Sequence, residues 1–325
     1  MSRIFAGALV ATALASTPVW AQDAYPVTVE HAFGETVIEE FPERIVTLSW
    51  MSQEAIIALG ESPVAIQYQA WGGDENGYLP WIKDAYAERG EELPPTIDTT
   101  DGVPFEELLT YEPDLIFVPY SGYSQEEYQR LSAIAPTIPF KEIPWSGGWQ
   151  EVIEIAGNVL GRQDEAQELV ADTQNMLESY VEQYPVIEGK TFAFGGGMGV
   201  DGAGMGVYLP HDPRVHLLSD LGLVPAEALH ELPADSYTSK ISYENLDTID
   251  ADVFIAWYND QETVDTLMAN PLFARWQPIA EGHFVPLTDL SYAMALSAPS
   301  ALSLPWAMDR FVPRLAETLE EGDAR

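Results

Sequence analysis

Short apolar runs alternate with helical patterns along the first half of the chain. Continuous apolar runs predict strands at residues 44–49 (RIVTLS), 63–67, 96–98 and 114–119 (DLIFVP). Between the first two, Ser52 is placed to cap a helix that stops at Gly60, and the Ser124–Glu127 capping box opens another helix. Strands without polar alternation, each followed by a helix, are typical of a mostly parallel sheet covered on both faces. The pattern therefore predicts an α/β fold.

The pattern changes after Gly161 and then begins again. Residues 164–184 form one uninterrupted helical run of about 30 Å, roughly the width of a small domain. Strands are then expected at 191–194, 252–257 (DVFIAW) and 284–287, with helices at 214–221 and at 299–320. A single helix between two α/β halves would act as a spine.

The two halves repeat one motif. A short helix near Glu106 precedes a strand that starts at Asp114, and a short helix near Glu244 precedes a strand that starts at Asp252. Each pair is separated by 138 residues, because 244 − 106 and 252 − 114 give the same value. We therefore expect an N-terminal lobe at 22–161, a linker helix at 162–186 and a C-terminal lobe at 187–325, with mostly parallel sheets.

The N-terminus and the charge narrow the class of protein. Residues 1–21 combine a basic start, an apolar core and a small-x-small site that ends at Ala21, which predicts a cleaved signal peptide. The chain has no cysteine, so neither disulfides nor a lipid on cysteine are expected, and export to the periplasm follows. The net charge of −38 argues against nucleic-acid binding, because phosphates are bound by clustered Lys and Arg. The 52 Asp and Glu residues are spread along the chain rather than clustered, which indicates a solubilising surface.

Large side chains follow the predicted strands. Ligands of open α/β sheets bind beyond the carboxyl ends of strands. The residues expected to reach such a site are Trp50, Tyr68, Trp71, Tyr120, Trp145, Trp257, Tyr258 and Tyr292.

A glycine-rich stretch at 195–206 follows the strand at 191–194. It contains a GxGxxG pattern, but residues 207–210 look extended, and a dinucleotide site needs a helix there. We expect a flexible loop whose Met198 and Met205 can contact a ligand. Arg214, one of 14 basic residues, follows this loop and can pair either with an anionic ligand or with a neighbouring acid. The five histidines show no metal-binding spacing.

Ordered motifs link the chain to a known family. These are residues 42–48 (PERIVTL), 112–116 (EPDLI), 131–137 (LSAIAPT), 160–162 (LGR), 270–273 (NPLF), and 71–77 with Pro80-Trp81. In this order, from about residue 27 to 320, the chain resembles the helical-backbone (class III) periplasmic binding proteins of iron-siderophore, haem and vitamin B12 ABC importers. The resemblance implies two α/β lobes that face each other across a cleft.

The resemblance also implies partners and roles. In the family, a glutamate on each lobe docks into arginine pockets of the membrane permease, and Glu106 and Glu244 match those positions. The same two glutamates can equally favour a helix dipole in the first turn. A ferric siderophore has its iron already coordinated, so the protein needs aromatic walls and hydrogen bonds rather than metal ligands.

The sequence thus predicts a monomeric, non-catalytic protein without a cofactor that delivers a ferric siderophore to an inner-membrane ABC permease. Two alternatives stay open. Haem, a cobalamin or a metal ion can be the ligand of the same fold, since tyrosines that could bind haem iron are plentiful. An exported hydrolase is the other, but its two carboxylates would lie in separate lobes rather than around one bond.

Overall fold

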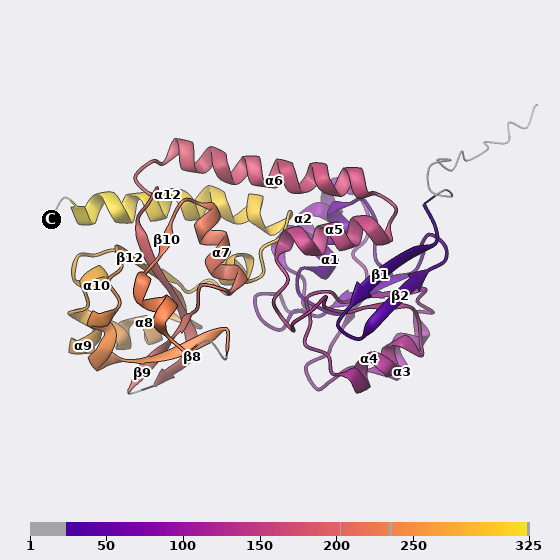
Figure 1. The fold of residues 1–325 in the computed structure, drawn as a ribbon, viewed down its shortest axis with the longest axis horizontal. Helices are drawn as coiled ribbons and strands as arrows, with labels where there is room; N and C mark the ends of the chain where they lie inside the picture. The colour runs from indigo at the N-terminus through magenta and orange to yellow at the C-terminus, as the bar shows by residue number, and fades with distance from the viewer. Residues whose placement is uncertain (1–23, 202, 234–235, 324–325) are drawn as a thin grey trace, which may run out of the picture.

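A computed structural model describes residues 24–323 apart from 202 and 234–235. The predicted signal peptide, residues 1–21, lies outside the described residues. Two lobes lie side by side, and helix α6 (Gln163–Gln183) runs along both of them (Figure 1). Within the described residues, no helix combines the length and apolar character needed to span a bilayer.

The N-terminal lobe is built on short parallel strands. Strands β3, β6 and β7 form one sheet, β4 and β5 form another, and a bridge between Val46 and Ala65 connects the two. An antiparallel hairpin, β1–β2, lies at the outer end of the lobe (Figure 1). The strands are β1 (Val27–His31), β2 (Gly34–Ile38), β3 (Ile45–Thr47), β4 (Ile66–Gln67), β5 (Thr96–Ile97), β6 (Leu115–Phe117) and β7 (Thr137–Ile138). The helices are α1 (Ser52–Ala58), α2 (Pro80–Arg89), α3 (Phe105–Thr110), α4 (Gln125–Ser132) and α5 (Trp149–Val159).

The C-terminal lobe contains one mixed sheet of six strands. Its order is β11-β9-β8-β12-β13, with β10 also paired to β8. The pairs of β8 with β10 and β12, and of β12 with β13, are parallel, whereas β8–β9–β11 is antiparallel. The strands are β8 (Thr191–Asp201), β9 (Gly204–Tyr208), β10 (Val224–Pro225), β11 (Thr238–Ser242), β12 (Val253–Trp257) and β13 (Phe284–Leu287).

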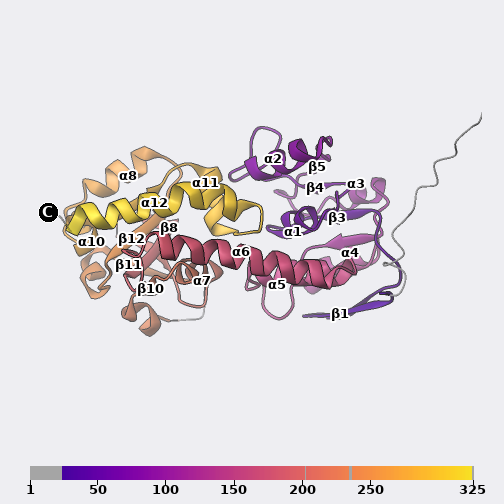
Figure 2. The same cartoon turned by 90° about the horizontal axis from the view of Figure 1, so that it is seen from above.

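Helices cover this sheet and close the chain. They are α7 (Pro213–Asp220), η2 (Glu227–Glu231), η3 (Tyr243–Thr248), α8 (Gln261–Met268), α9 (Pro271–Ala274), α10 (Gln277–Ala280), α11 (Leu290–Ser297) and α12 (Ser303–Asp323). Seen from above, α6 and α12 lie next to each other (Figure 2). The final helix predicted at 299–320 is α12, and Pro313 lies inside it.

The predicted long helix is confirmed as α6, continuous over 21 residues. Contacts at both ends tie it to the lobes. The Arg162 side chain, just before its start, binds the Leu59 carbonyl and the Glu61 carboxylate of the N-terminal lobe. Near its end, the Tyr180 hydroxyl binds the Asp309 carboxylate on α12. Side-chain hydrogen bonds therefore connect α6 to both lobes.

The internal repeat has a structural counterpart. Asp114, just before β6, accepts hydrogen bonds from the backbone amides of Glu43 and Arg44, both at 2.8 Å, where neighbouring β3 begins. Asp252, just before β12, accepts one from the backbone amide of Thr191 at 2.6 Å, where neighbouring β8 begins. In each lobe the repeated aspartate thus aligns two adjacent parallel strands, because its carboxylate binds amides at the start of the other strand.

Two local predictions are wrong. Ser52 is the first helical residue of α1, and the N-cap is Met51, whose φ of 63° turns the chain after β3. The glycine-rich stretch is the β8–β9 hairpin rather than a flexible loop. Glycines fit in β8 because any side chain would collide: a Cβ on Gly196 would lie 2.2 Å from Nε1 of Trp257.

Candidate functional site

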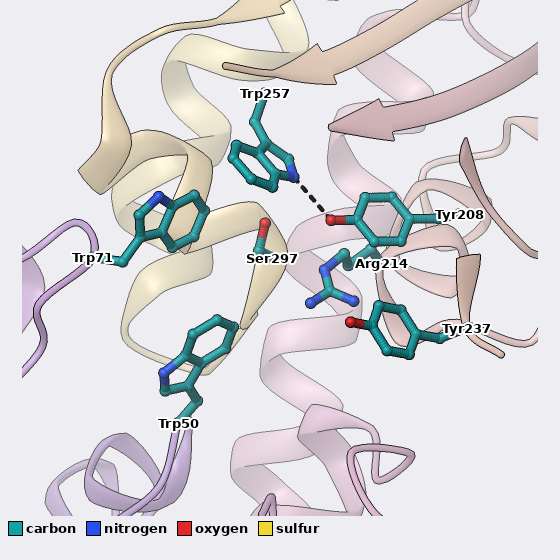
Figure 3. Close-up of a pocket in the computed structure, with 7 residues that line it drawn as sticks. All are labelled: Trp50, Trp71, Tyr208, Arg214, Tyr237, Trp257 and Ser297. Carbon is teal, nitrogen blue, oxygen red and sulfur yellow. Dashed lines mark hydrogen bonds between the residues drawn. The ribbon is translucent and has the colours of Figure 1, made fainter. Parts of the chain in front are cut away.

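A cavity lies between the lobes at the carboxyl ends of strands from both. Its volume is about 240 Å³, and its lining residues are Trp50, Trp71, Tyr208, Arg214, Tyr237, Trp257 and Ser297 (Figure 3). A second space of about 230 Å³ shares Trp50, Arg214 and Tyr237 with it and adds Tyr120, Trp145 and Asp212. We treat these two spaces together as the cleft site.

The N-terminal lobe contributes an aromatic wall. Trp50 follows β3, and its indole stacks on that of Trp71 with ring centroids 6.1 Å apart and planes 16° apart. Trp145 meets Tyr120 edge to face at 5.5 Å. Trp145 has a φ of 60° and is 44% exposed, so a large ring is held open to solvent at the cleft. Exposed aromatic faces of this kind are typical of a ligand-binding surface.

The C-terminal lobe contributes Trp257, which ends β12. Gly196 and Gly197 of neighbouring β8 leave room for its indole, since a Cβ on Gly197 would lie 2.8 Å from the ring. The indole Nε1–H donates to the Tyr208 hydroxyl at 2.8 Å (Figure 3). Trp257 also meets Trp71 of the other lobe edge to face at 5.1 Å. The two lobes therefore touch through the rings that line the cleft site.

Arg214 places a positive charge in this aromatic setting. Its guanidinium lies 4.5 Å from the ring centroid of Tyr208 and forms a 2.8 Å ion pair with Asp212, which is 1% exposed. Burial lowers the pKa of Arg214, but the charge interactions with Tyr208, Asp212 and Tyr120 outweigh it and raise the pKa overall. The side chain is therefore charged at every physiological pH.

Free hydrogen-bonding capacity remains in the cleft site. The Nε of Arg214 and the Oγ of Ser297 are buried and bond to no described residue. Burial raises the pKa of Tyr120 to about 12, so its hydroxyl stays protonated. A ligand with oxygen acceptors can use these donors, while its apolar parts lie against the indoles.

The structure brings together six of the residues predicted for ligand binding. Trp50, Trp71, Tyr120, Trp145, Arg214 and Trp257 all line the cleft site. Arg214 forms the predicted pair with an acid, Asp212, and it also lines the cavity, so pairing with a ligand stays a prediction. The Met198 side chain lies outside what the structure describes.

Four predicted ligand residues do not line the cleft site. Met205 and Tyr258, each 1% exposed, belong to the core on the other side of the C-terminal sheet. Tyr292 is 7% exposed and packs with Trp306, and its hydroxyl donates to the Ala307 carbonyl at 3.4 Å. Tyr68 packs its ring over Gly77. For the three tyrosines, position after a strand does not fix the direction of the side chain. Met205, expected in a flexible loop, lies in β9 and points into the core.

Sequence reasoning missed Tyr208, Asp212, Tyr237 and Ser297. Tyr208 ends β9, and Tyr237 lies beside it because β9 and β11 are antiparallel; the rings stack with centroids 6.5 Å apart. Asp212 carries a readable signal, since Asp before Pro-Arg is typical of a helix N-cap, and it accepts from the Arg214 backbone amide at 2.9 Å. No sequence signal distinguishes Tyr237 or Ser297.

Glu106 and Glu244 lie in equivalent places, both exposed in the first turn of a short helix. Glu106 is on α3 at the lower end of the N-terminal lobe (Figure 1). Glu244 is on η3, which packs against α9 at the lower end of the other lobe through Tyr243 and Phe273. The two short helices that carry these glutamates thus lie at the side of the molecule opposite α6 (Figure 1).

Comparisons with known proteins agree with this architecture. The crystal structure of PiaA from Streptococcus pneumoniae TIGR4 in complex with ferrichrome has a TM-score of 0.83 and 31% identity, covering 91% of this chain and 99% of that one. The ferric enterobactin-binding periplasmic protein FepB of Escherichia coli is 25% identical over 84% of this chain and 88% of its own length. The probable siderophore-binding lipoprotein YfiY of Bacillus subtilis is 30% identical, over 45% of this chain and only 42% of its own length. The periplasmic binding protein family matches residues 45–289, and the chain belongs to that family.

Proposed function

We propose that this protein captures a ferric siderophore in the periplasm and delivers it, as a monomer, to an ABC importer in the inner membrane. The observation that carries the proposal is the cleft site itself: tryptophans from both lobes surround one charged arginine whose side chain is only 11% exposed. A ferric siderophore offers the complementary chemistry, because it combines flat or apolar faces with electron-rich oxygens around the metal.

In this proposal the iron enters as part of its chelate, and the protein needs no cofactor. Among the described residues, no group of three or more His, Asp or Glu side chains is placed to hold a metal ion. The cleft site offers donors instead: the Arg214 guanidinium, the Tyr120 hydroxyl and the Ser297 hydroxyl. Donors suit the coordinated oxygens of a chelate, and the chemistry proposed is binding and release without turnover.

The relatives support the ligand class and the partner. PiaA is described in complex with ferrichrome and FepB as binding ferric enterobactin, and both align over most of their length. Glu106 and Glu244 support docking, because exposed carboxylates on one side of both lobes can form bidentate pairs with arginines of a permease. Export rests on the predicted signal peptide.

Tryptophan fluorescence tests the proposal directly. We expect ferrichrome, but not its iron-free form, to quench the emission, because the chelate would lie against Trp50, Trp71 and Trp257. Trp257→Phe should remove much of the quenching. The matched control is Trp276→Phe, since Trp276 is buried in the C-terminal lobe and bonded to the Ile249 carbonyl.

The alternatives give different results. Absence of quenching by every member of a panel of hydroxamate, catecholate and carboxylate ferric chelates would refute a siderophore ligand. A Soret shift on adding haemin, without any response to the panel, would favour haem.

A further inference from the structure

A third cavity lies in the N-terminal lobe next to the cleft site. Its volume is about 260 Å³, and Trp145 lines both this space and the cleft site. Its walls come from the segments that follow four parallel strands: Leu48 after β3, Gln67 at the end of β4, Thr99 after β5 and Ser121 after β6. Because ligands of parallel sheets bind at this edge, the cavity is placed as an extension of the cleft site.

The free polar atoms of this N-lobe cavity are chiefly acceptors. The Gln67 amide uses Nε2 to donate to the Thr99 hydroxyl at 3.1 Å, and the Tyr123 hydroxyl donates to the Leu48 carbonyl at 2.9 Å. The Gln67 Oε1 and the Ser121 Oγ are buried and bond to no described residue. Unsatisfied buried polar atoms are costly and therefore indicate a polar occupant.

A negative charge lies at the same wall. The Glu127 carboxylate lines the cavity and uses Oε2 in the capping box of α4, where it accepts from the Ser124 amide at 2.8 Å. Tyr123 lines the cavity beside it, and the Glu127 charge adds to burial in raising the pKa of the Tyr123 hydroxyl. None of the described lining residues is a lysine or an arginine. The N-lobe cavity thus has a carboxylate and no basic side chain among its described lining residues, whereas the cleft site pairs its carboxylate, Asp212, with Arg214.

We infer that the N-lobe cavity is a subsite for a protonated amine on an arm of the siderophore, with Glu127, Gln67 and Ser121 as its acceptors. The inference rests on the proposed function, because the iron centre would occupy the cleft site. The arm would pass Trp145, whose ring lines both spaces and whose backbone amide donates to the Ser121 carbonyl at 3.2 Å. Siderophores with a cationic arm would therefore be preferred over the same chelates without the charge.

Two ligands that differ only in this charge test the inference. Ferrioxamine B is a linear ferric trihydroxamate that ends in a primary amine, and N-acetylation removes the charge and leaves the iron centre unchanged. We expect the unprotected chelate to bind about fivefold more tightly, the scale of one partly exposed ion pair. Glu127→Gln should abolish that preference. This variant should fold, because glutamine also completes a capping box.

The matched control is Glu126→Gln, an exposed neighbour on the same helix that does not line the cavity. The control should keep the fivefold preference, which separates a local effect from general attraction to an acidic surface. An equal affinity for both linear chelates, or a preference that survives Glu127→Gln, would overturn the inference. A protein that binds ferrichrome but neither of the two linear chelates would also overturn it. Failure of the whole ferric panel, ferrichrome included, would instead overturn the proposed function.

Discussion

Replacing Asp212 by asparagine isolates the cost of a buried charge in the cleft site. The Asp212 side chain is 1% exposed and the Arg214 side chain 11% exposed, and their charged atoms are 2.8 Å apart. Asp212 is also the N-cap of α7, through its bond from the Arg214 backbone amide. Asparagine caps a helix about as well as aspartate, so Asp212→Asn removes the charge and keeps the cap.

The expected loss is about 3 kcal/mol in the free energy of unfolding. Removing one partner of a buried ion pair costs about 3–5 kcal/mol, because the other charge stays buried without compensation. The lower end applies here, since the Arg214 guanidinium keeps its contact with the Tyr208 ring and a small exposed fraction. With a urea m-value of about 2 kcal/mol/M, the unfolding midpoint of the C-terminal lobe should fall by about 1.5 M.

Urea unfolding followed by tryptophan fluorescence measures this loss. The matched control is Asp260→Asn, because Asp260 caps α8 through the Thr263 amide at 2.7 Å but is exposed and lines no part of the cleft site. The control should change the free energy of unfolding by a few tenths of a kcal/mol. A loss below about 0.5 kcal/mol in Asp212→Asn, or equal losses in both variants, would refute the reasoning.

Three further predictions concern other parts of the molecule. Burial raises the pKa of Glu54 to about 7, so the stability that it contributes is fully present below its unfolded-state pKa and is lost as pH rises through about 7. The difference in free energy of unfolding between Glu54→Gln and the parent protein, measured by urea unfolding, should therefore grow in favour of the variant from pH 4 to pH 8, by up to about 3 kcal/mol. Gly72→Ala should weaken siderophore binding about tenfold by fluorescence titration, because at a φ of 85° its Cβ would lie 2.8 Å from that of Met294, forcing the Trp71 loop away from α11. Glu106→Ala with Glu244→Ala should abolish uptake into cells and leave siderophore affinity unchanged.

Each of these predictions has a matched control. Glu88→Gln, exposed on α2, should show no such pH-dependent gain. Gly90→Ala shares the strain of a positive φ of 66° but meets nothing within 4 Å, so its binding should stay normal. Glu107→Ala with Asp250→Ala removes nearby exposed charges, and uptake should persist. Reduced affinity of the isolated Glu106/Glu244 double variant would show that these glutamates serve the ligand rather than the permease.

The features that could be predicted from the sequence depend on local patterns. The helical run that nothing interrupts before Pro185 predicts α6. The Ser124–Glu127 capping box can be recognised because its bonds span three residues. The repeat with Asp114 and Asp252 can be read from the sequence because the same residue pattern recurs after 138 residues. The hydrogen bonds that the two carboxylates accept join segments 61 to 71 residues apart and are not visible in the sequence.

The failures concern residues whose environment is set by distant partners. The glycines of β8 predict a flexible loop when they are considered alone. They form a strand whose missing side chains leave room for the indole of Trp257, about 60 residues later. Met205 alternates with residues that face the other side of β9, and this register depends on pairing with β8 and β11. Tyr237 reaches the cleft site only through that same antiparallel pairing. Composition and spacing carry no information about which strand lies opposite which.

The same contacts that form the cleft site also connect the lobes. The Ser291 hydroxyl of the C-terminal lobe donates to the Gly72 carbonyl at 2.6 Å, and this bond holds the loop that carries Trp71 against Trp257. Since α6 is fastened to both lobes, the spacing that these contacts require already exists in the free protein. Preorganisation of this kind lowers the ordering cost of binding. Ligand capture should therefore involve small lobe movements, and a scattering profile that shrinks sharply when a ferric chelate binds would contradict this argument.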